Sequence, residues 1–360
     1  MKPSSSCGSQ NNIPMKFDRS VRVLLMALFF VISSQVNSQE QCRQVLEKAE
    51  SLFEQGIIEE IPDMLSDCIK IGLSPEDKIR AQKLVILSYL FDKNIDEAER
   101  VMLSFLGSNP EYEAQPSDPA EFVQLLSNFT SSPVISFGTS FGSIFSSPVM
   151  MQPYSPYSIN GYSPGFSSFD PGVQFGAGIN IYLSPRVEIG LEAVYMKSNF
   201  KYSASMYGFS ELRIEESHEM LEFPVSLKYV FPDQTWSPYI QLGSSYGIVL
   251  DSRADFRRVY SGAAEQLYDP VVNNDVNLGN MRNSALWSGF LGGGLRYKIP
   301  RGFFFLDVSY YFGLSNMVNN ENRWMQETVF DFYHTDGDFR MDYLSFSIGF
   351  RLIIYNPRKI

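Results

Sequence analysis

The residues of this chain with the clearest chemical potential are two histidines, three cysteines and a set of regularly spaced charged side chains. His218 and His334 are its only imidazoles, and an imidazole beside a serine or a carboxylate can act as a general base. Nothing in the sequence fixes such a neighbour, so an enzyme is the least favoured interpretation. The sequence also has no phosphate loop, zinc-ligand spacing or nucleophile elbow, and we expect no cofactor.

Asp336 and Asp338 flank Gly337 in a segment that could contact calcium. Calcium prefers carboxylate and carbonyl oxygens, and its known binding loops supply several of them at fixed positions. The remaining ligands do not follow here, so the sequence predicts no metal site.

Cys42 and Cys68 are the two cysteines that remain once an N-terminal leader is removed. An even number of cysteines in a secreted chain favours a disulfide. Their spacing places both at the open end of a helical hairpin that turns at Gly56. We therefore predict a Cys42–Cys68 bridge, with two free thiols on helix faces as the alternative.

Eight charged residues alternate with apolar residues along the second part of the chain. Because side chains alternate between the two faces of a strand, these charges would share the inner face of a closed sheet. Opposite charges in a dry interior are tolerable only when they are paired. The sequence thus predicts an interior ion-pair network, with a gated proton or ion path as the alternative, formed by Glu188, Glu192, Glu222, Lys228, Arg296, Lys298, Asp307 and Arg351.

Stretches with a period of two predict eight strands that would carry these charges. The last stretch alternates large apolar residues with small or polar ones, and its length suits the apolar band of a membrane barrel, about 25 Å tall. The expected strands are Val134–Gly142, Val173–Leu183, Val187–Met196, Leu221–Val230, Tyr239–Leu250, Leu286–Ile299, Phe303–Gly313 and Tyr343–Tyr355.

The connections between these strands alternate between short and long. Segments 184–186, 232–237 and 300–302 are short, whereas segments 143–172, 197–219, 251–284 and 314–342 are long and are expected to be loops. In outer-membrane barrels the short turns lie in the periplasm and the long loops outside the cell. An even strand number then leaves both termini in the periplasm.

By this alternation and these lengths, Val134–Tyr355 resembles the small porin-type β-barrel domains of the Gram-negative outer membrane. The resemblance implies an eight-stranded antiparallel up-and-down transmembrane barrel, surrounded by outer-membrane lipid and too narrow for a wide pore. Such barrels commonly end at an aromatic residue that the assembly machinery recognises. Here five residues follow Tyr355, so that signal would be read at Phe350 or Tyr355.

The first part of the chain has the 3.6-residue period of helices. Residues Ile79–Tyr112 resemble one tetratricopeptide repeat, because Tyr89, Ala98, Phe105 and Pro110 occupy its tyrosine, small, bulky and proline positions. The resemblance implies a short helical-repeat domain of four or five helices, and surfaces of such repeats bind other proteins.

An apolar run at Val23–Ile32 follows three cationic residues and predicts a signal peptide. We place its cleavage after Ser38 and favour Met15 as the start. The expected organisation is a leader over 1–38, a periplasmic tetratricopeptide-like domain over 39–132, a barrel over 133–356 and a tail over 357–360. The formal charge of −11 becomes more negative without the cationic leader, which argues against nucleic acid as a partner.

Aromatic residues are concentrated in the first long connection among several prolines. Exposed aromatics of this kind can recognise a surface ligand, or they can pack over the lip of the barrel, and the sequence leaves both interpretations open. The residues are Tyr154, Tyr157, Tyr162, Phe166 and Phe169.

These features favour a non-enzymatic outer-membrane anchor whose helical domain binds a periplasmic or outer-membrane protein. A subunit of a secretion or surface-protein assembly complex would fit this pattern. The alternative is a narrow channel, or a barrel that binds a surface ligand through its extracellular loops. An outer-membrane enzyme with an active site at the rim is a weaker possibility.

Overall fold

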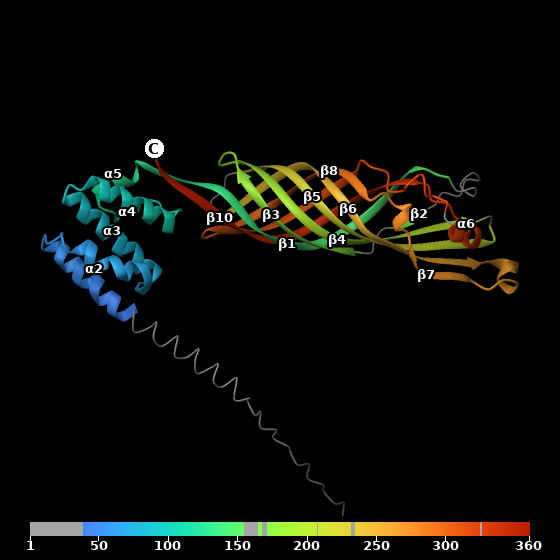
Figure 1. Cartoon of the computed structure of the whole chain (residues 1–360), viewed down its shortest axis with the longest axis horizontal. Coiled ribbons are helices and arrows are strands. Elements are labelled where there is room, and N and C mark those ends of the chain that lie inside the picture. Colours follow the sequence, from blue (N-terminus) through green and yellow to red (C-terminus); the bar gives the residue numbers. More distant parts are fainter. Residues whose placement is uncertain (1–38, 155–164, 168–170, 207, 232–234, 325) are drawn as a thin grey trace, which may run out of the picture. The chain divides into compact units, whose positions relative to one another are not determined.

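The computed structural model describes residues 39–154, 165–167, 171–206, 208–231, 235–324 and 326–360. The chain divides into a helical unit, within Met1–Thr130 and Arg358–Ile360, and a barrel unit, Ser131–Pro357 (Figure 1). The leader predicted for residues 1–38 lies outside the described residues.

Over residues 39–130 the helical unit contains five helices, within the four or five that the resemblance implies. Ser74 begins α3 by accepting a hydrogen bond from the Asp77 amide, and Asn94 begins α4 by accepting one from the Glu97 amide. None of the helices among the described residues is long and apolar enough to cross a membrane. The helices cover residues 39–54, α2 (Ile61–Asp67) with a following π-helical turn (Cys68–Gly72), α3 (Pro75–Phe91), α4 (Ile95–Ser108) and α5 (Ala120–Leu126).

The helical unit has its own apolar core. Ala98 and Phe105, two of the positions that resemble a tetratricopeptide repeat, are fully buried there. The last residues of the chain, expected to be a tail, belong to this unit. The Ile360 amide donates to the Asn128 carbonyl at 2.9 Å, and Lys359 Nζ lies 2.6 Å from a Glu99 carboxylate oxygen.

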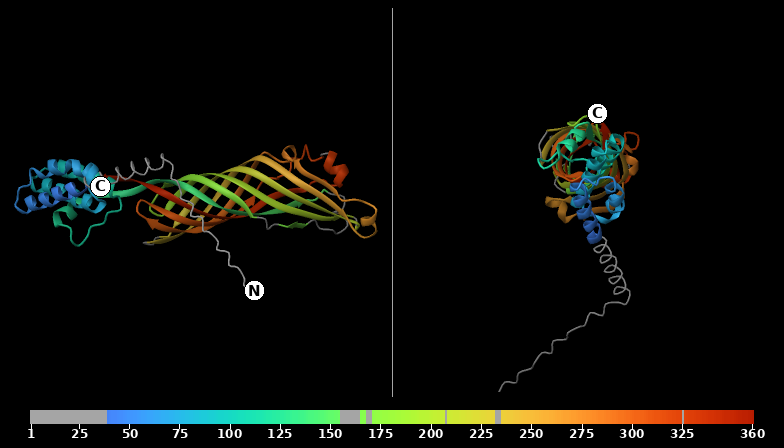
Figure 2. Two further views of the ribbon diagram at one scale, coloured as in Figure 1. Left: turned by 90° about the horizontal axis from the view of Figure 1, so that it is seen from below. Right: turned by 90° about the vertical axis from the view of Figure 1, so that its left-hand side faces the viewer.

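Eight antiparallel strands form the barrel wall, as the sequence predicts. Their order around the ring is β4-β3-β1-β10-β9-β8-β6-β5, and pairing of β4 with β5 closes it. Two short strands, β2 (Gly165–Ser167) and β7 (Val271–Asn277), pair with β4 and β6. Figure 2 shows the wall strands inclined to the long axis of the barrel. They are β1 (Phe129–Gln152), β3 (Pro171–Tyr182), β4 (Val187–Met206), β5 (Ser210–Val230), β6 (Trp236–Tyr260), β8 (Ala285–Ile299), β9 (Gly302–Gly313) and β10 (Asp338–Lys359).

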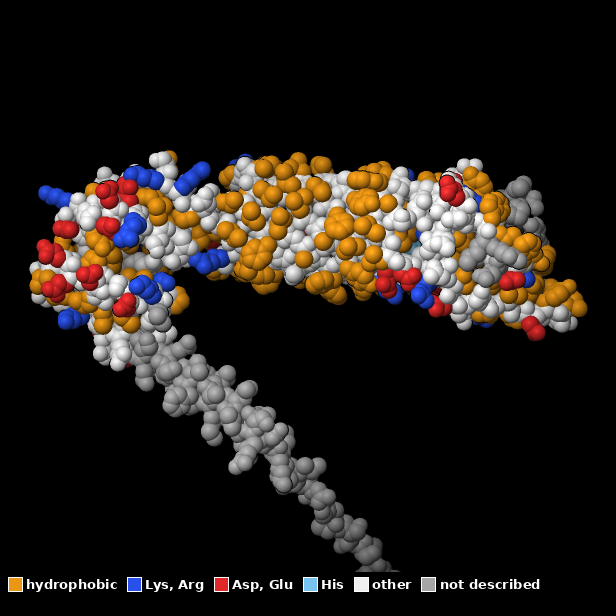
Figure 3. Space-filling model, in the orientation of Figure 1, with side chains coloured by type: hydrophobic (Ala, Val, Ile, Leu, Met, Phe, Trp, Pro, Cys, Tyr) orange, Lys and Arg blue, Asp and Glu red, His pale blue; other side chains and the backbone are white. Residues whose placement is uncertain are grey.

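Exposed large apolar residues on every wall strand form an apolar band around the barrel, and Figure 3 shows one face of it. Trp236 packs on Tyr297 at the end with the short turns, and Tyr246 packs on Trp287 at the opposite border. Ten residues of β6 separate the two borders. At about 3.3 Å per residue and a tilt of about 45°, they span roughly 23 Å, close to the ~25 Å of a membrane barrel.

Four wall strands, β1, β4, β5 and β6, continue far beyond the upper aromatic border. Much of segments 143–172, 197–219 and 251–284, expected to be loops, consists instead of extensions of these four strands together with β7. The period of two persists there, with charged residues such as Arg213 and Glu215 outside and Leu212 and Ile214 inside. The outer face turns polar because it leaves the apolar band, while the inner face still builds a core. We call residues 197–219, 251–284 and 314–342 the head.

Candidate functional site

The lower lumen of the barrel holds two ion-paired carboxylates, Glu188, which is buried, and Glu192, which is partly buried. Arg296 donates to both oxygens of Glu188, at 2.5 and 2.8 Å, from the opposite side of the ring. Glu192 Oε1 accepts from Arg351 Nη2 at 2.6 Å and from Lys228 Nζ at 3.3 Å. These contacts neutralise the charges across the lumen, as a dry interior requires.

The other three predicted members of the network behave differently. Asp307 accepts from Tyr239, Gln241 and Ser309, at 2.9, 2.7 and 2.6 Å. Glu222 accepts from the hydroxyl groups of Tyr343, at 2.6 Å, and Ser245, at 2.9 Å. Lys298 does not belong to the buried network, because it lies exposed near the short turn where β8 ends. Hydroxyl and amide donors thus replace part of the expected charge pairing.

Side chains fill the lumen. A cavity of about 40 Å³ lies along the network and is lined by Glu192, Lys228 and Asp307 among others, which is room for only a few waters. Small inward residues permit this filling, since a Cβ at Gly294 would lie 2.5 Å from the Tyr239 hydroxyl. The described part of the lumen therefore contains a packed polar core.

The head contains a second buried polar cluster, centred on Glu216 of β5. Arg282 donates to both Glu216 oxygens, at 2.5 and 2.8 Å, and to Asp336 at 2.7 Å. His218 Nε2 lies 3.1 Å from Glu216 Oε1, and Ser252 Oγ lies 2.9 Å from His218 Nδ1. His334 Nε2 approaches Asp336 at 3.0 Å. Both histidines predicted at the rim thus lie buried within this cluster.

Burial and charge act in opposite directions on the two carboxylates of the head cluster. Burial alone would raise the pKa of Glu216, but the nearby Arg282 guanidinium and the His218 contact outweigh it and lower that pKa below its usual value. The pKa of Asp336 is lowered in the same way by Arg282 and His334. Both groups are therefore carboxylates at neutral pH.

A serine beside an imidazole and a carboxylate has the parts of a hydrolytic nucleophile. His218 and Ser252 are nevertheless completely buried, and Phe200 stacks on the imidazole with the ring centres 5.5 Å apart. The neighbouring cavity, which Glu216 and His334 line, is about 20 Å³ and has room for one water. No substrate reaches Ser252 in this conformation.

The two aspartates considered as calcium ligands contact arginines. Asp336 pairs with Arg282, and Asp338 pairs with Arg323 at 2.5 Å. Across the described ranges, no group of three or more histidine, cysteine or acidic side chains is arranged to hold a metal ion.

The predicted loop aromatics are only partly described. The Arg323 guanidinium lies 3.9 Å from the ring centre of Tyr154, and Phe166 lies in β2 opposite Tyr202. Tyr157, Tyr162 and Phe169 lie outside the described residues. Tyr154 therefore contacts the head while its side chain stays partly exposed, and both interpretations of the loop aromatics stay predictions.

Two features stabilise the helical unit. Cys42 and Cys68 form the predicted disulfide, with their α-carbons 5.4 Å apart. Asp118, whose side chain is almost fully buried, accepts from Lys83 Nζ at 2.6 Å and from the Tyr112 hydroxyl at 2.7 Å. Burial would raise the pKa of Asp118, but these hydrogen bonds outweigh it and lower that pKa below its ordinary value.

Comparison with known proteins identifies one family. The family model described as "Outer membrane protein beta-barrel domain" matches residues 134–319, more than half of the chain. A search of curated proteins gives no match.

Similar solved structures include the outer membrane protein OprG from Pseudomonas aeruginosa, 12% identical over 64% of this chain and 98% of that one, with a TM-score of 0.35. Neisserial surface protein A is 10% identical over 62% and 97% of the two chains, with a TM-score of 0.31. The Yersinia pestis protein Ail, in complex with sucrose octasulfate, is 12% identical over 61% and 99%, with a TM-score of 0.27. Because these similarities are weak, the assignment depends on the family match.

Proposed function

The chain belongs to the outer membrane protein β-barrel domain family, and from this premise we propose that it is a non-enzymatic anchor whose helical unit binds another envelope protein. The barrel resides in the Gram-negative outer membrane, in contact with lipid. The observation that carries the proposal is the packed lumen joined in one chain to a separately folded helical unit. Because side chains fill its lumen, we infer that the barrel serves to hold the helical unit at the membrane.

The strand registers support a periplasmic position for the helical unit. The start of β1 lies beside the end of β3, where Ile135 pairs with Ile181. The end of β10 lies beside the turn before β9, where Leu352 pairs with Gly302. Both strand ends are thus at the side of the short turns, which faces the periplasm in outer-membrane barrels.

The helical unit supports protein binding through its architecture. Its helices pack around two clusters of buried apolar residues, both of which contact Phe53, Tyr89 and Val101, and stacked helices present extended surfaces that commonly bind proteins. A subunit of a secretion or surface-protein assembly complex remains the class of protein that best suits an anchor of this kind.

The burial of Ser252 and His218 supports the non-enzymatic part of the proposal. A fluorophosphonate, which reacts with activated serines, should not label the folded protein in membranes. The Ser252→Ala variant is the control. Labelling that this substitution abolishes would establish an accessible nucleophile and contradict the proposal.

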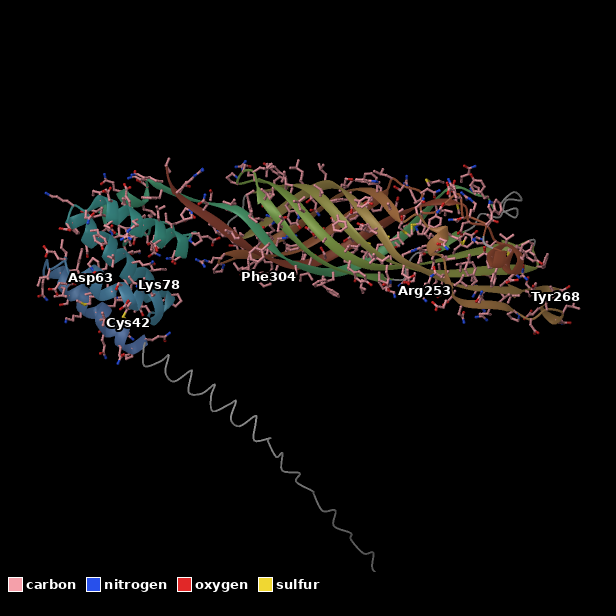
Figure 4. The ribbon with its side chains drawn as sticks, viewed as in Figure 1. Cys42, Asp63, Lys78, Arg253, Tyr268 and Phe304 are labelled. Carbon is pink, nitrogen blue, oxygen red and sulfur yellow. A yellow bond between two sulfur atoms is a disulfide. The ribbon has the colours of Figure 1, made fainter. Side chains whose placement is uncertain are left out.

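One observation favours a second candidate function, surface-ligand binding by the head. Large apolar residues lie exposed at its tip, where Tyr268 is labelled in Figure 4. Exposed apolar patches often mark interaction sites. The residues are Phe209, Leu267, Tyr268 and Val272.

Copurification separates the two candidate functions. The full chain and a chain that lacks residues 40–128 would be tagged in the head and purified from outer membranes after mild cross-linking. We expect a protein partner with the full chain alone. A partner retained by the barrel alone would favour the head, and no partner with either form would contradict the proposed anchor function.

A further inference from the structure

The helical unit exposes an apolar surface where its two hairpins turn. Phe53, near the end of the first helix, packs edge-on against Phe91 at the end of α3, with ring centres 5.6 Å apart. This contact brings the turn at 55–60 beside the turn at 92–94. We call Phe53, Ile57, Phe91 and Ile95 the turn patch.

The turn patch is unusually exposed for its residue types. Phe91 is 53% exposed, Ile95 is 47% exposed and Ile57 is 45% exposed. Covering each of these side chains would be favourable, because it removes apolar surface from water. Since the same hairpins bury Ala98, Met102 and Phe105 completely, the exposure is local and does not reflect a loose fold.

Carboxylates surround the turn patch. Glu54, Glu59, Glu60, Asp92 and Asp96 are all exposed, whereas Lys93 is the single cationic residue of segments 53–60 and 91–97. None of these five carboxylates forms a described ion pair. Other acids of the same unit do, including Glu50 with Arg80, Glu97 with Arg100 and Asp118 with Lys83. The carboxylates at the patch are therefore available to a cation from another molecule.

We propose that the turn patch docks a segment of a periplasmic protein that carries Lys or Arg beside apolar residues. This inference rests on the proposed function, because it assigns the surface that holds the partner. Apolar side chains of the segment cover Phe91 and Ile95, and its cationic groups meet the surrounding carboxylates. Complementary charge selects the partner and speeds its association.

The charge of the helical unit argues against two other occupants. Residues 39–130 contain 18 acidic and eight cationic side chains, and Figure 3 shows acidic and basic groups among apolar ones on the visible face of this unit. Two copies of the turn patch would repel each other. An anionic lipid surface would repel it as well, because membrane-binding surfaces are cationic.

Site-specific photo-cross-linking in growing cells tests the proposal on the full chain. Benzoylphenylalanine in place of Phe91 keeps an aromatic group at the patch. The control position is Glu76, which is exposed 15 residues earlier on α3, about 22 Å away along the helix. We expect an adduct at position 91 and none at position 76, and mass spectrometry should map it to a protein segment rich in Lys or Arg and apolar residues.

Charge reversal gives the second readout. Asp92→Lys with Asp96→Lys should reduce the adduct at position 91 by about tenfold, since like charges disfavour a partner strongly. Glu113→Lys, on the exposed connection between α4 and α5, should leave the yield unchanged.

The other outcomes overturn the proposal in distinguishable ways. An adduct with an acidic segment, with lipid or with a second copy of this chain would refute the assigned partner. An adduct at position 76 alone would show that another face of the helical unit binds, and the proposed anchor function would stand. No protein adduct at either position would refute both.

Discussion

Arg282, on the connection between β7 and β8, binds Glu216 of β5 through two parallel hydrogen bonds of 2.5 and 2.8 Å. Both side chains are almost fully buried. Paired charges inside a protein are costly to separate because the remaining charge has no water around it. This ion pair therefore ties the connection that precedes β8 to the centre of the head.

Replacing Arg282 with Met should destabilise the head selectively. It leaves Glu216 and Asp336 buried without their cation, a change that typically costs about 3 to 5 kcal/mol. Chymotrypsin should then cleave the head of the membrane-inserted protein faster than in the unsubstituted chain. Arg213→Met is the control, because Arg213 pairs with Glu211 on the exposed face. Equal cleavage of the two variants would argue against a structural role for the buried pair.

The lumen gives a parallel prediction for Arg351. Arg351→Met removes the closer of the two cations at Glu192, and the expected loss of barrel stability is about 3 to 5 kcal/mol. Urea unfolding followed by gel mobility measures it. Arg186→Met, in the exposed turn between β3 and β4, should leave the midpoint unchanged. An unshifted midpoint for Arg351→Met would count against the ion pair.

The packed lumen predicts negligible conductance. Purified protein in planar bilayers should give no stable openings of nanosiemens size, because a cavity of about 40 Å³ holds only a few waters. Steady openings of that size would mean that the charged interior is hydrated and continuous.

Because Cys42 and Cys68 form a disulfide, we expect the helical unit to be less stable when the two thiols are not linked. Cys42 and Cys68 close a loop with a sequence separation of 26, for which chain entropy gives about 3 to 3.5 kcal/mol of stabilisation. The double variant Cys42→Ser, Cys68→Ser should lower the melting temperature of the helical circular dichroism signal while the barrel signal persists. Mass spectrometry of the unreduced protein should find the two cysteine peptides linked, and two alkylated thiols would refute the bridge.

The lowered pKa of Asp118 predicts that its contribution to the stability of the helical unit is lost in acid. Its pKa in the folded protein is below the ordinary value, so its stabilising effect is complete above about pH 4 and is lost as the pH falls through the folded pKa. The stability difference between the parent chain and Asp118→Asn should therefore be constant near neutral pH and should shrink below about pH 4. A difference that grows toward acid would contradict the lowered pKa.

Local patterns made the wall strands and the helices predictable. The alternation of large apolar with small or polar residues along Tyr343–Tyr355 depends only on which face of the strand meets apolar surroundings. In the structure these residues lie within β10. The Cys42–Cys68 pairing was likewise predictable, because a hairpin about Gly56 brings residues at similar distances from the turn together.

The head cluster was beyond sequence reasoning because it depends on strand register. His218 and Ser252 face each other as partners between β5 and β6, and a shift of one residue would send them to opposite faces. Glu222 meets Tyr343 only because the ring closes and brings distant strands together across the lumen. A sign of the strand extension was present, since residues 211–219 keep the period of two with charges such as Glu215 and Glu219 on one face.

The extension of β4 from Tyr195 to Met206 also sets how far the head stands beyond the apolar band. Eleven residues at about 3.3 Å each, tilted by about 45°, rise roughly 26 Å beyond Tyr195. A strand-built column of this height holds the exposed side chains of Phe209 and Tyr268 far from the band that lipid surrounds.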